Sequence, residues 1–294
     1  MRQACYSKLV SEDLLSKRYR EFGGIPRFLF HKVRERDGKE DVLLNPYRNQ
    51  QTAALLDVAV EPQRADDGEI VKAYKGLWTL YHIHPLMNAD GTTNYYEFIV
   101  APCCADAHTR IRDSLMQKEV KDLWNIYMNT RDEMGALRGI RYEAYAHKKI
   151  MADGLQADAV GLTASGLSTT TPVQISIPAG SSQFDLVNNG VDRYLVDAVT
   201  EGRKKKSGSY LLPHFPNYPV VDSIYVPHGT AQPVLLQMKA GESRPLASDK
   251  ATSISHATGG SQALYFVTPD ATTMTKKLAG ADQLKQYRVI LREG

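Results

Sequence analysis

The chain has 294 residues, of which 43% are hydrophobic and 23% are charged, and its formal net charge is +3. This composition is ordinary for a globular, soluble protein, and the length allows two modest domains with a sizeable core. No run of about 18 apolar residues occurs, so a transmembrane helix and a membrane partner are not expected. A charge of this size is too small to indicate nucleic-acid binding by itself.

Cysteine usage and the N-terminus favour a reducing compartment, such as cytosol or nucleus. The three cysteines, Cys5, Cys103 and Cys104, are odd in number and two are adjacent, so no disulfide framework is expected. Residues 1–8 lack the apolar core of a signal peptide. We therefore expect no signal peptide in this chain, which is compatible with the start of an excised fragment.

The segment before Gly135 is predicted to be helical with one β-hairpin. Its helices are expected over residues 9–20, from Pro26, over 50–60 and over 105–128, the last as one helix or a pair. Its strands are expected over 78–84 and 95–100, with a turn at 88–91. Helices followed by a hairpin are typical of a small winged-helix or lid-type domain, to which we assign residues 1–134.

Two histidines in the predicted hairpin raise the possibility of a zinc site. His82 and His84 occupy alternate positions of a strand and share a face, and Cys103 and Cys104 follow the hairpin. The ligand spacings of structural zinc sites are absent, however. Half-buried strand histidines and two core thiols are the favoured interpretation.

The segment from Gly135 onward is predicted to be an α/β (α+β) domain over residues 135–294. Helices are expected over 139–154, within 189–208 and over 248–257. Strands are expected over 172–178, 183–187, 219–226, 233–239, 263–268 and 286–291, with 210–219 as a proline-rich lead into a hairpin. The order helix, strands, hairpin, helix, strand, strand predicts a mixed central sheet flanked by helices.

The hairpin over residues 219–239 carries polar residues inside apolar sequence. Gly229 lies in its short link, Asp222 is in the first strand, and Gln237 and Lys239 share one face of the second. An acid, an amide and an ammonium on a sheet surface are costly to bury unless something binds there. The pattern indicates a divalent cation and a phosphate, although a buried Asp222–Lys239 salt bridge in a core strand is the plainer alternative.

Glu143 and His147 lie at positions i and i+4 of the predicted helix over 139–154, so their side chains project side by side. Such a pair is commonly a surface charge pair. It also suits a carboxylate and an imidazole presented to a site on the sheet. The spacing alone leaves both interpretations open.

A basic run, Arg203, Lys204, Lys205 and Lys206, lies between a predicted short helix and the hairpin. The positive excess of the chain lies in the half after Gly135, which contains this run. By itself such a run indicates a solvated loop or a localisation signal. Beside a phosphodiester site it becomes a candidate contact to the DNA backbone, because lysines neutralise phosphates without recognising sequence.

The helix acid Glu143, then Asp222, then Gln237 and Lys239 in a Gln-x-Lys spacing, resemble the layout of the PD-(D/E)xK restriction-endonuclease-like fold. Further blocks resemble the C-terminal regions of Crinkler effectors and the related retrotransposon-hot-spot proteins. These blocks are residues 19–30, 139–147, 218–224, 236–239, 263–267 and 286–289. In that family a P-loop NTPase precedes a nuclease-like domain. The P-loop pattern G-x-x-x-x-G-K-[ST] does not occur here, and neither does the Crinkler secretion leader.

The resemblance implies a secreted pathogen effector that acts on DNA in the host cell nucleus. It implies that Asp222 and Glu143, with a carbonyl oxygen of Gln237 or Met238, hold Mg²⁺ or Mn²⁺. Lys239 would orient or activate the attacking water, and His147 would position Glu143. The implied partners are double-stranded DNA, host nuclear proteins and a second copy of the chain, because many nucleases of this fold pair to cut both strands.

Gln237 departs from the family pattern, which has an acid at this position. A neutral amide is a weaker cation ligand, so the expected alternative is a catalytically inactive DNA- or protein-binding effector on a nuclease-like fold. A third possibility is a regulatory lid and scaffold that needs an NTPase domain. Retained Lys239 favours the metal-dependent endonuclease.

Overall fold

The computed structural model describes Ser16 and residues 81–87, 93–130, 135–186, 193–213, 218, 220–241, 246, 248–260, 263–270 and 273–292. Contacts divide the chain into two compact units. The first unit is Met1–Lys118 with Met128–Leu137, and the second is Glu119–Tyr127 with Arg138–Gly294. Ser16 is helical. The other residues of the helices predicted before residue 61 lie outside the described residues, and so does the predicted turn at 88–91.

The described part of the first unit contains the predicted hairpin. Strands β1 (Tyr81–Met87) and β2 (Thr93–Pro102) pair antiparallel, which confirms the two strands. Helix α5 (Ala105–Met116) follows, and its first turn is capped by the thiol of Cys104, which accepts a hydrogen bond from the backbone N–H of Ala107 at 3.4 Å. Cys103 and Cys104 are partly buried, and their sulfur atoms lie 3.7 Å apart, so they are not joined by a disulfide.

Two helices of the chain meet in an aromatic cluster inside the second unit. They are α6 (Val120–Met128) and α7 (Gly135–Asp153), and α5 with α6 confirms the predicted helix pair. The ring of Trp124 lies 4.8 Å from that of Tyr145, and the ring of Tyr127 lies 5.2 Å from that of Tyr142. Aromatic pairs at these distances add packing energy beyond the apolar area they bury.

One member of the aromatic cluster carries a buried hydroxyl that has no hydrogen-bond partner among the described residues. It belongs to Tyr142, whose pKa is raised well above its usual value by burial. An unsatisfied buried hydroxyl costs roughly 1–3 kcal/mol, whereas the ring keeps its contacts in Phe. We expect Tyr142→Phe to raise the free energy of unfolding by about 1 kcal/mol in a urea titration. A loss of stability would show that the hydroxyl is satisfied in solution.

Helix α7 ends where the sequence predicts. Gly154 follows the last helical residue with a φ of 78°, and its N–H donates to the carbonyl of Ile150 at 2.9 Å. A Cβ at this position would lie 2.6 Å from the carbonyl oxygen of Ile177. Glycine is therefore required both by the left-handed turn and by the close approach of the neighbouring strand.

The second unit is built on a mixed sheet of nine described strands. The strands are β3 (Leu155–Thr163), β4 (Gly166–Leu167), β5 (Val173–Ile177), β6 (Ser182–Leu186), β7 (Ser209–Pro213), β8 (Ser223–Val226), β9 (Val234–Met238), β10 (Ala263–Thr268) and β11 (Lys285–Ile290). Their order is β4-β3-β11-β10-β9-β8-β7-β6, and β5 pairs with β3 beside this path. β9, β10 and β11 are mutually parallel, as are β6 and β7, whereas the remaining pairs are antiparallel. The predicted mixed sheet is confirmed.

Three strands were not predicted, and each has a local reason. β3 lacks a clear alternation, because its buried residues Leu155, Ala159 and Leu162 are irregularly spaced. β4 has two residues and gives no pattern. β7 lies in a segment predicted to be a proline-rich lead, which is wrong for residues 209–213. Pro213 is its last residue, where a missing N–H costs little.

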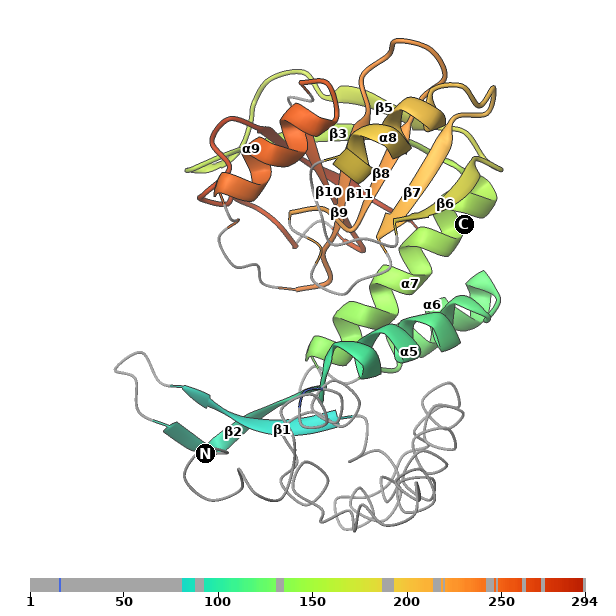
Figure 1. Ribbon diagram of the computed structural model, residues 1–294. Coiled ribbons are helices and arrows are strands. Elements are labelled where there is room, and N and C mark those ends of the chain that lie inside the picture. Colours follow the sequence, from blue (N-terminus) through green and yellow to red (C-terminus); the bar gives the residue numbers. More distant parts are fainter. Residues whose placement is uncertain are drawn as a thin grey trace, which may run out of the picture. The chain divides into compact units, whose positions relative to one another are not determined.

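The sheet has different helices on its two faces. Helices α8 (Arg193–Gly202) and α9 (Ser248–Ala257) cover one face, as Figure 1 shows, and both were predicted. The core beneath them includes Leu195, Ile254, Leu211, Ile224, Leu235 and Phe266. Because side chains alternate along a strand, Tyr210 points away from this core, and it contacts His147 of α7. α7 therefore lies against the opposite face.

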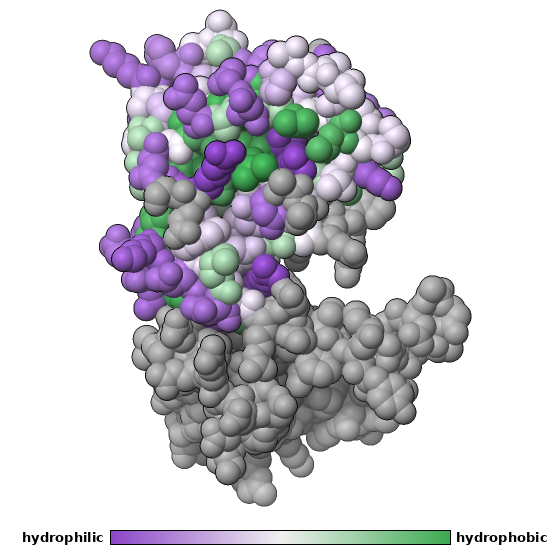
Figure 2. Space-filling view, turned by 180° about the vertical axis from the view of Figure 1, so that it is seen from behind, coloured by the Kyte–Doolittle hydropathy of each residue, from purple (hydrophilic) through white to green (hydrophobic). Residues whose placement is uncertain are grey.

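The described surface mixes hydrophilic and apolar residues. On the face seen in Figure 2, apolar residues gather near the middle of the described area, with hydrophilic residues around them. Phe184, on β6 at the end of the strand order, is 48% exposed.

No helix among the described residues is long and apolar enough to cross a membrane.

Candidate functional site

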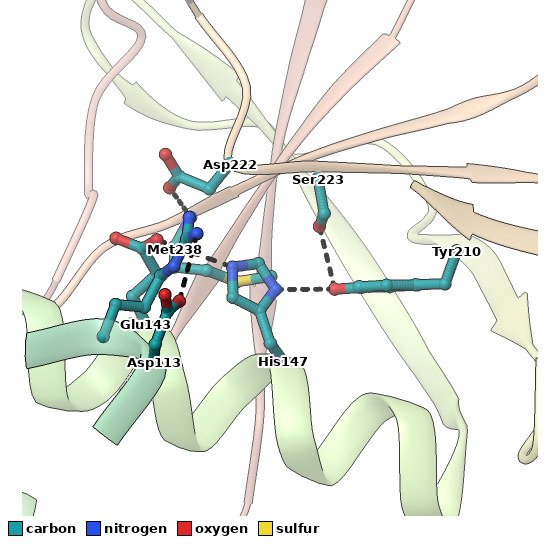
Figure 3. Close-up of polar contacts among 8 residues, drawn as sticks. Asp113, Glu143, His147, Tyr210, Asp222, Ser223 and Met238 are labelled. Atoms are coloured by element: carbon teal, nitrogen blue, oxygen red, sulfur yellow. Dashed lines mark hydrogen bonds and ion pairs between the residues drawn. The ribbon is translucent and has the colours of Figure 1, made fainter. Parts of the chain in front are cut away.

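The polar residues of the predicted hairpin gather at one end of the sheet. β8 and β9 run antiparallel, so the residue before β8, Asp222, lies beside the end of β9. The N–H of Asp222 donates to the carbonyl of Leu236 at 2.9 Å, and its carboxylate oxygen Oδ2 accepts from the N–H of Met238 at 2.6 Å (Figure 3). The next residue, Lys239, continues the ladder by donating its N–H to the carbonyl of Val267 at 2.9 Å.

The backbone is strained directly before this site. Val220 has a φ of 69°, a left-handed conformation that is unusual for a β-branched residue. Its side chain is 6% exposed and belongs to the core beneath α8 and α9. Burial of this side chain therefore holds a turn that places Asp222, two residues later, at the end of β9. Strain of this kind is concentrated at functional sites.

The carboxyl group of Asp222 is in a setting that disfavours its charge. Burial, followed by the nearby carboxylate of Glu143, raises the pKa of Asp222 to about 7, although Lys239 and the Met238 N–H act in the opposite direction. Two carboxylates close together in a partly dehydrated place are stabilised by a cation between or beside them. This electrostatic setting supports a binding role better than a simple Asp222–Lys239 salt bridge does.

Helix α7 brings Glu143 and His147 to the same place. His147 is fully buried, and its Nε2 lies 3.7 Å from Oε1 of Glu143, whose side chain is 20% exposed. On the other side of the ring, Nδ1 lies 2.9 Å from the hydroxyl of Tyr210, which also accepts a hydrogen bond from Ser223 at 2.8 Å (Figure 3). The pair is therefore turned inward onto the sheet, and the surface-pair interpretation is wrong.

Two residues of this network were not anticipated from the sequence. Tyr210 is the second residue of the unpredicted strand β7, so nothing marked its side chain as inward-facing. Ser223 follows Asp222 and is completely buried in a strand with no exposed residue. A hydroxyl in such an apolar run was the available signal, because buried hydroxyls require partners.

Gln237 lies in β9 and is 9% exposed. Alternation places its side chain on the side of Leu235 and Lys239, opposite to that of Met238, as the sequence predicts for Gln237 and Lys239. Its amide oxygen Oε1 is buried and has no hydrogen-bond partner among the described residues. A buried carbonyl oxygen without a donor is an oxygen available to a cation or a water.

The basic run lies at the other end of the sheet. Ser209 at the start of β7 pairs with Val226 at the end of β8, and the carbonyl of Arg203 accepts from the N–H of Gly229 at 3.0 Å. The four steps along β8 from Asp222 to Val226 span roughly 13 Å. The run therefore lies beyond Val226, at the end of β8 opposite to the carboxylate site.

Within the run, the four side chains differ in exposure. Arg203 is partly buried, whereas Lys204, Lys205 and Lys206 are exposed. Lys204 forms an ion pair with Glu201 on the last turn of α8. Lys205 and Lys206 are therefore the members best placed to contact a phosphate.

The donor set suits a hard cation that keeps much of its own water. No group of three or more His, Cys, Asp and Glu side chains that could hold a metal occurs among the described residues. Asp222 and Glu143 supply two carboxylates, whereas alternation turns Oε1 of Gln237 toward the face of Leu235, opposite to the face on which α7 lies. Mg²⁺ is commonly bound through one or two carboxylates, with waters and substrate phosphate completing its octahedron, so these residues fit Mg²⁺ or Mn²⁺.

Comparison with known proteins gives no relative: no protein-family model, no curated protein and no solved structure matches this chain.

Proposed function

We propose that the second unit is a restriction-endonuclease-like domain that hydrolyses phosphodiester bonds of double-stranded DNA with Mg²⁺ or Mn²⁺. The observation that carries the proposal is the carboxylate of Asp222, held at the end of β9 beside Glu143 and under the influence of Lys239. Carboxylates can hold a metal at a phosphate, and an ammonium group beside them can orient a water, so Asp222, Glu143 and Lys239 suit this chemistry.

Element order supports the same proposal. α7 carries the first acid, and β7, β8 and β9 form an antiparallel meander in which Asp222 precedes β8 and Lys239 follows β9. α9 then leads to β10, which pairs parallel with β9. This order of the helix acid, the Asp and the Gln-x-Lys segment resembles the PD-(D/E)xK layout, which supports the proposal.

Each residue has a chemical role in this proposal. A bound Mg²⁺ supplies a Lewis acid that polarises the scissile phosphate and lowers the pKa of water. Asp222 and Glu143 hold the cation, with a backbone carbonyl oxygen of Gln237 or Met238 as a further ligand. The ammonium of Lys239 orients the attacking water and offsets the negative charge that develops on the phosphate. His147, whose Nε2 lies 3.7 Å from Oε1 of Glu143, positions this carboxylate.

The second candidate function is a DNA- or protein-binding effector without catalysis. Gln237 favours it, because an amide replaces the acid of the family pattern and makes the cation site weaker. On the resemblance to Crinkler effectors we further propose secretion by a pathogen and action in the host nucleus, with residues 1–134 as a lid-type domain. A second copy of the chain would allow both strands to be cut.

Incubation of purified protein with supercoiled plasmid tests the proposal. We expect Mg²⁺ or Mn²⁺ to produce nicked and linear plasmid, and excess EDTA to stop the reaction. Plasmid that stays supercoiled with either metal, under conditions where it is retarded on a gel, would favour the binding function. Plasmid that is neither cut nor retarded would exclude both DNA-based functions.

The basic run is expected to strengthen DNA binding without recognising sequence. Lys205→Ala should weaken binding equally for unrelated duplexes and lower the slope of log K against log salt by about 1. The matched control is Lys121→Ala, which removes an exposed lysine of α6 in the same unit. Fluorescence anisotropy in Ca²⁺ or EDTA measures both slopes. Equal slopes for the two variants would remove the run from the DNA interface.

A further inference from the structure

Three buried side chains form a hydrogen-bonded network next to the carboxylate site. Ser223 on β8, Tyr210 on β7 and His147 on α7 are each completely buried. The hydroxyl of Ser223 donates to the hydroxyl oxygen of Tyr210 at 2.8 Å, and that oxygen lies 2.9 Å from Nδ1 of His147 (Figure 3). The rings of His147 and Tyr210 meet edge to face with centroids 5.9 Å apart.

The donors and acceptors of the three side chains determine the direction of each hydrogen bond among them. The Tyr210 oxygen already accepts from Ser223, and its own proton requires an acceptor because the group is buried. Among the described residues, the acceptor within reach is Nδ1 of His147. The Tyr210 hydroxyl keeps this proton throughout the neutral range, because burial and the charges of Asp222 and Glu143 raise its pKa above its ordinary value.

If Nδ1 accepts, the ring proton of His147 lies on the opposite nitrogen. Nε2 is buried and has no hydrogen-bond partner among the described residues, and Oε1 of Glu143 lies 3.7 Å away. This distance is too long for a hydrogen bond, but a small movement of the carboxylate would form one. The buried N–H is thus an unpaired donor that faces Glu143.

We propose that Tyr210 and Ser223 are positioning residues that hold His147 as the Nε2–H tautomer, so that its N–H orients Glu143 toward Asp222. The tautomer follows from the hydrogen-bond geometry alone, whereas the role in metal binding rests on the proposed function. Outer partners of this kind fix the orientation of metal-binding carboxylates and typically change metal affinity by 10- to 100-fold.

Nitrogen NMR of the ring tests the tautomer without any activity measurement. In a long-range ¹H–¹⁵N correlation spectrum of the wild-type full chain, we expect Nδ1 of His147 to resonate as an unprotonated nitrogen and Nε2 as a protonated one. Loss of the signals in His147→Gln assigns them. A proton on Nδ1 in the wild-type spectrum would overturn the proposal, and the His147→Gln variant serves only to assign the signals.

Binding of Mn²⁺, followed by the loss of its free EPR signal, tests the positioning role. Tyr210→Phe removes the donor to Nδ1 and is expected to weaken Mn²⁺ binding about tenfold. Tyr142→Phe is the matched control, since it removes a buried hydroxyl without a described partner and should leave Mn²⁺ affinity unchanged. Circular dichroism verifies that both variants are folded.

The outcomes separate this inference from the proposed function. Wild-type affinity in a folded Tyr210→Phe protein would overturn the positioning role, even if plasmid cleavage is observed. Absence of Mn²⁺ binding in the wild type would overturn both the metal site and the positioning role, while the NMR spectrum still decides the tautomer. If Tyr210→Phe does not fold, Ser223→Ala replaces it, with a smaller loss of affinity expected and an unchanged affinity counting against the role.

Discussion

Lys239→Met is expected to slow Mg²⁺-dependent plasmid cleavage by about 100- to 1,000-fold, the range found when one positioned charge or donor is removed from a developing anion. The substitution keeps most of the alkyl stem, so the packing at the end of β9 is retained, and the backbone bond from residue 239 to Val267 is unaffected. What is lost is the ammonium beside Asp222.

Initial rates of supercoiled plasmid loss measure this effect. The matched control is Lys121→Met, an exposed lysine of α6 that has no part in the proposed site, and it should cut at the wild-type rate. DNA affinity in EDTA should change little for Lys239→Met, because one phosphate contact is a small part of binding. Equal cleavage by both variants would remove Lys239 from the chemistry.

Asp222→Asn is expected to change stability and activity in opposite directions. In metal-free protein the folded state raises the pKa of Asp222 to about 7, against ~3.9 in an unfolded chain. The folded state therefore holds this proton more tightly than the unfolded state. The associated stability is fully present below pH ~4 and is lost as the pH rises toward about 7.

Replacing the carboxylate by an amide abolishes this decrease in stability with rising pH. We expect Asp222→Asn to be more stable than wild type by a few kcal/mol at pH 8 in EDTA, and equally stable near pH 4, because amide and protonated acid are then alike. Its oxygen can still accept from the Met238 N–H, which preserves the local backbone. Urea titrations at pH 4, 6 and 8 measure the difference.

The control for the pH series is Asp197→Asn, an exposed acid of α8, whose stability difference should stay within about 0.5 kcal/mol at every pH. Added Mg²⁺ should stabilise wild type and leave Asp222→Asn unchanged, because the variant lacks a charged ligand. Cleavage by Asp222→Asn should be lost. A variant that is less stable than wild type at pH 8 in EDTA would show that the Asp222 carboxylate forms a net stabilising salt bridge in the metal-free protein, and absence of stabilisation of wild type by Mg²⁺ would remove the metal site.

Local pattern was sufficient where an element has a strong signal at its ends or along its length. The helix that carries Glu143 was predicted because apolar residues recur at helical spacing and Gly154 stops it. The strands around Gly229 were predicted because each is a short apolar run beside turn residues. β3 and β7 gave no such signal, since an irregular pattern and a terminal proline conceal strands that pairing with neighbours stabilises.

The sequence likewise predicted some residues of the candidate site and missed others. Residue type and spacing were enough to select Asp222, Gln237, Lys239 and the Glu143–His147 pair. Tyr210 and Ser223 were missed, because a hydroxyl becomes recognisable as a partner only when its neighbours across the sheet are known. The basic run was placed near the hairpin by sequence distance, whereas strand direction puts it at the opposite end of β8.

The sequence by itself therefore determined the elements with clear periodicity, the mixed α/β class and the list of candidate residues, because these depend on local spacing and residue chemistry. Only the tertiary structure decided which candidates meet. Antiparallel pairing brings Asp222 to the end of β9, and packing of α7 on the sheet turns Glu143 and His147 inward. Burial and mutual charge, which raise the pKa of Asp222, arise only from that arrangement, because they depend on distances between residues far apart in the chain.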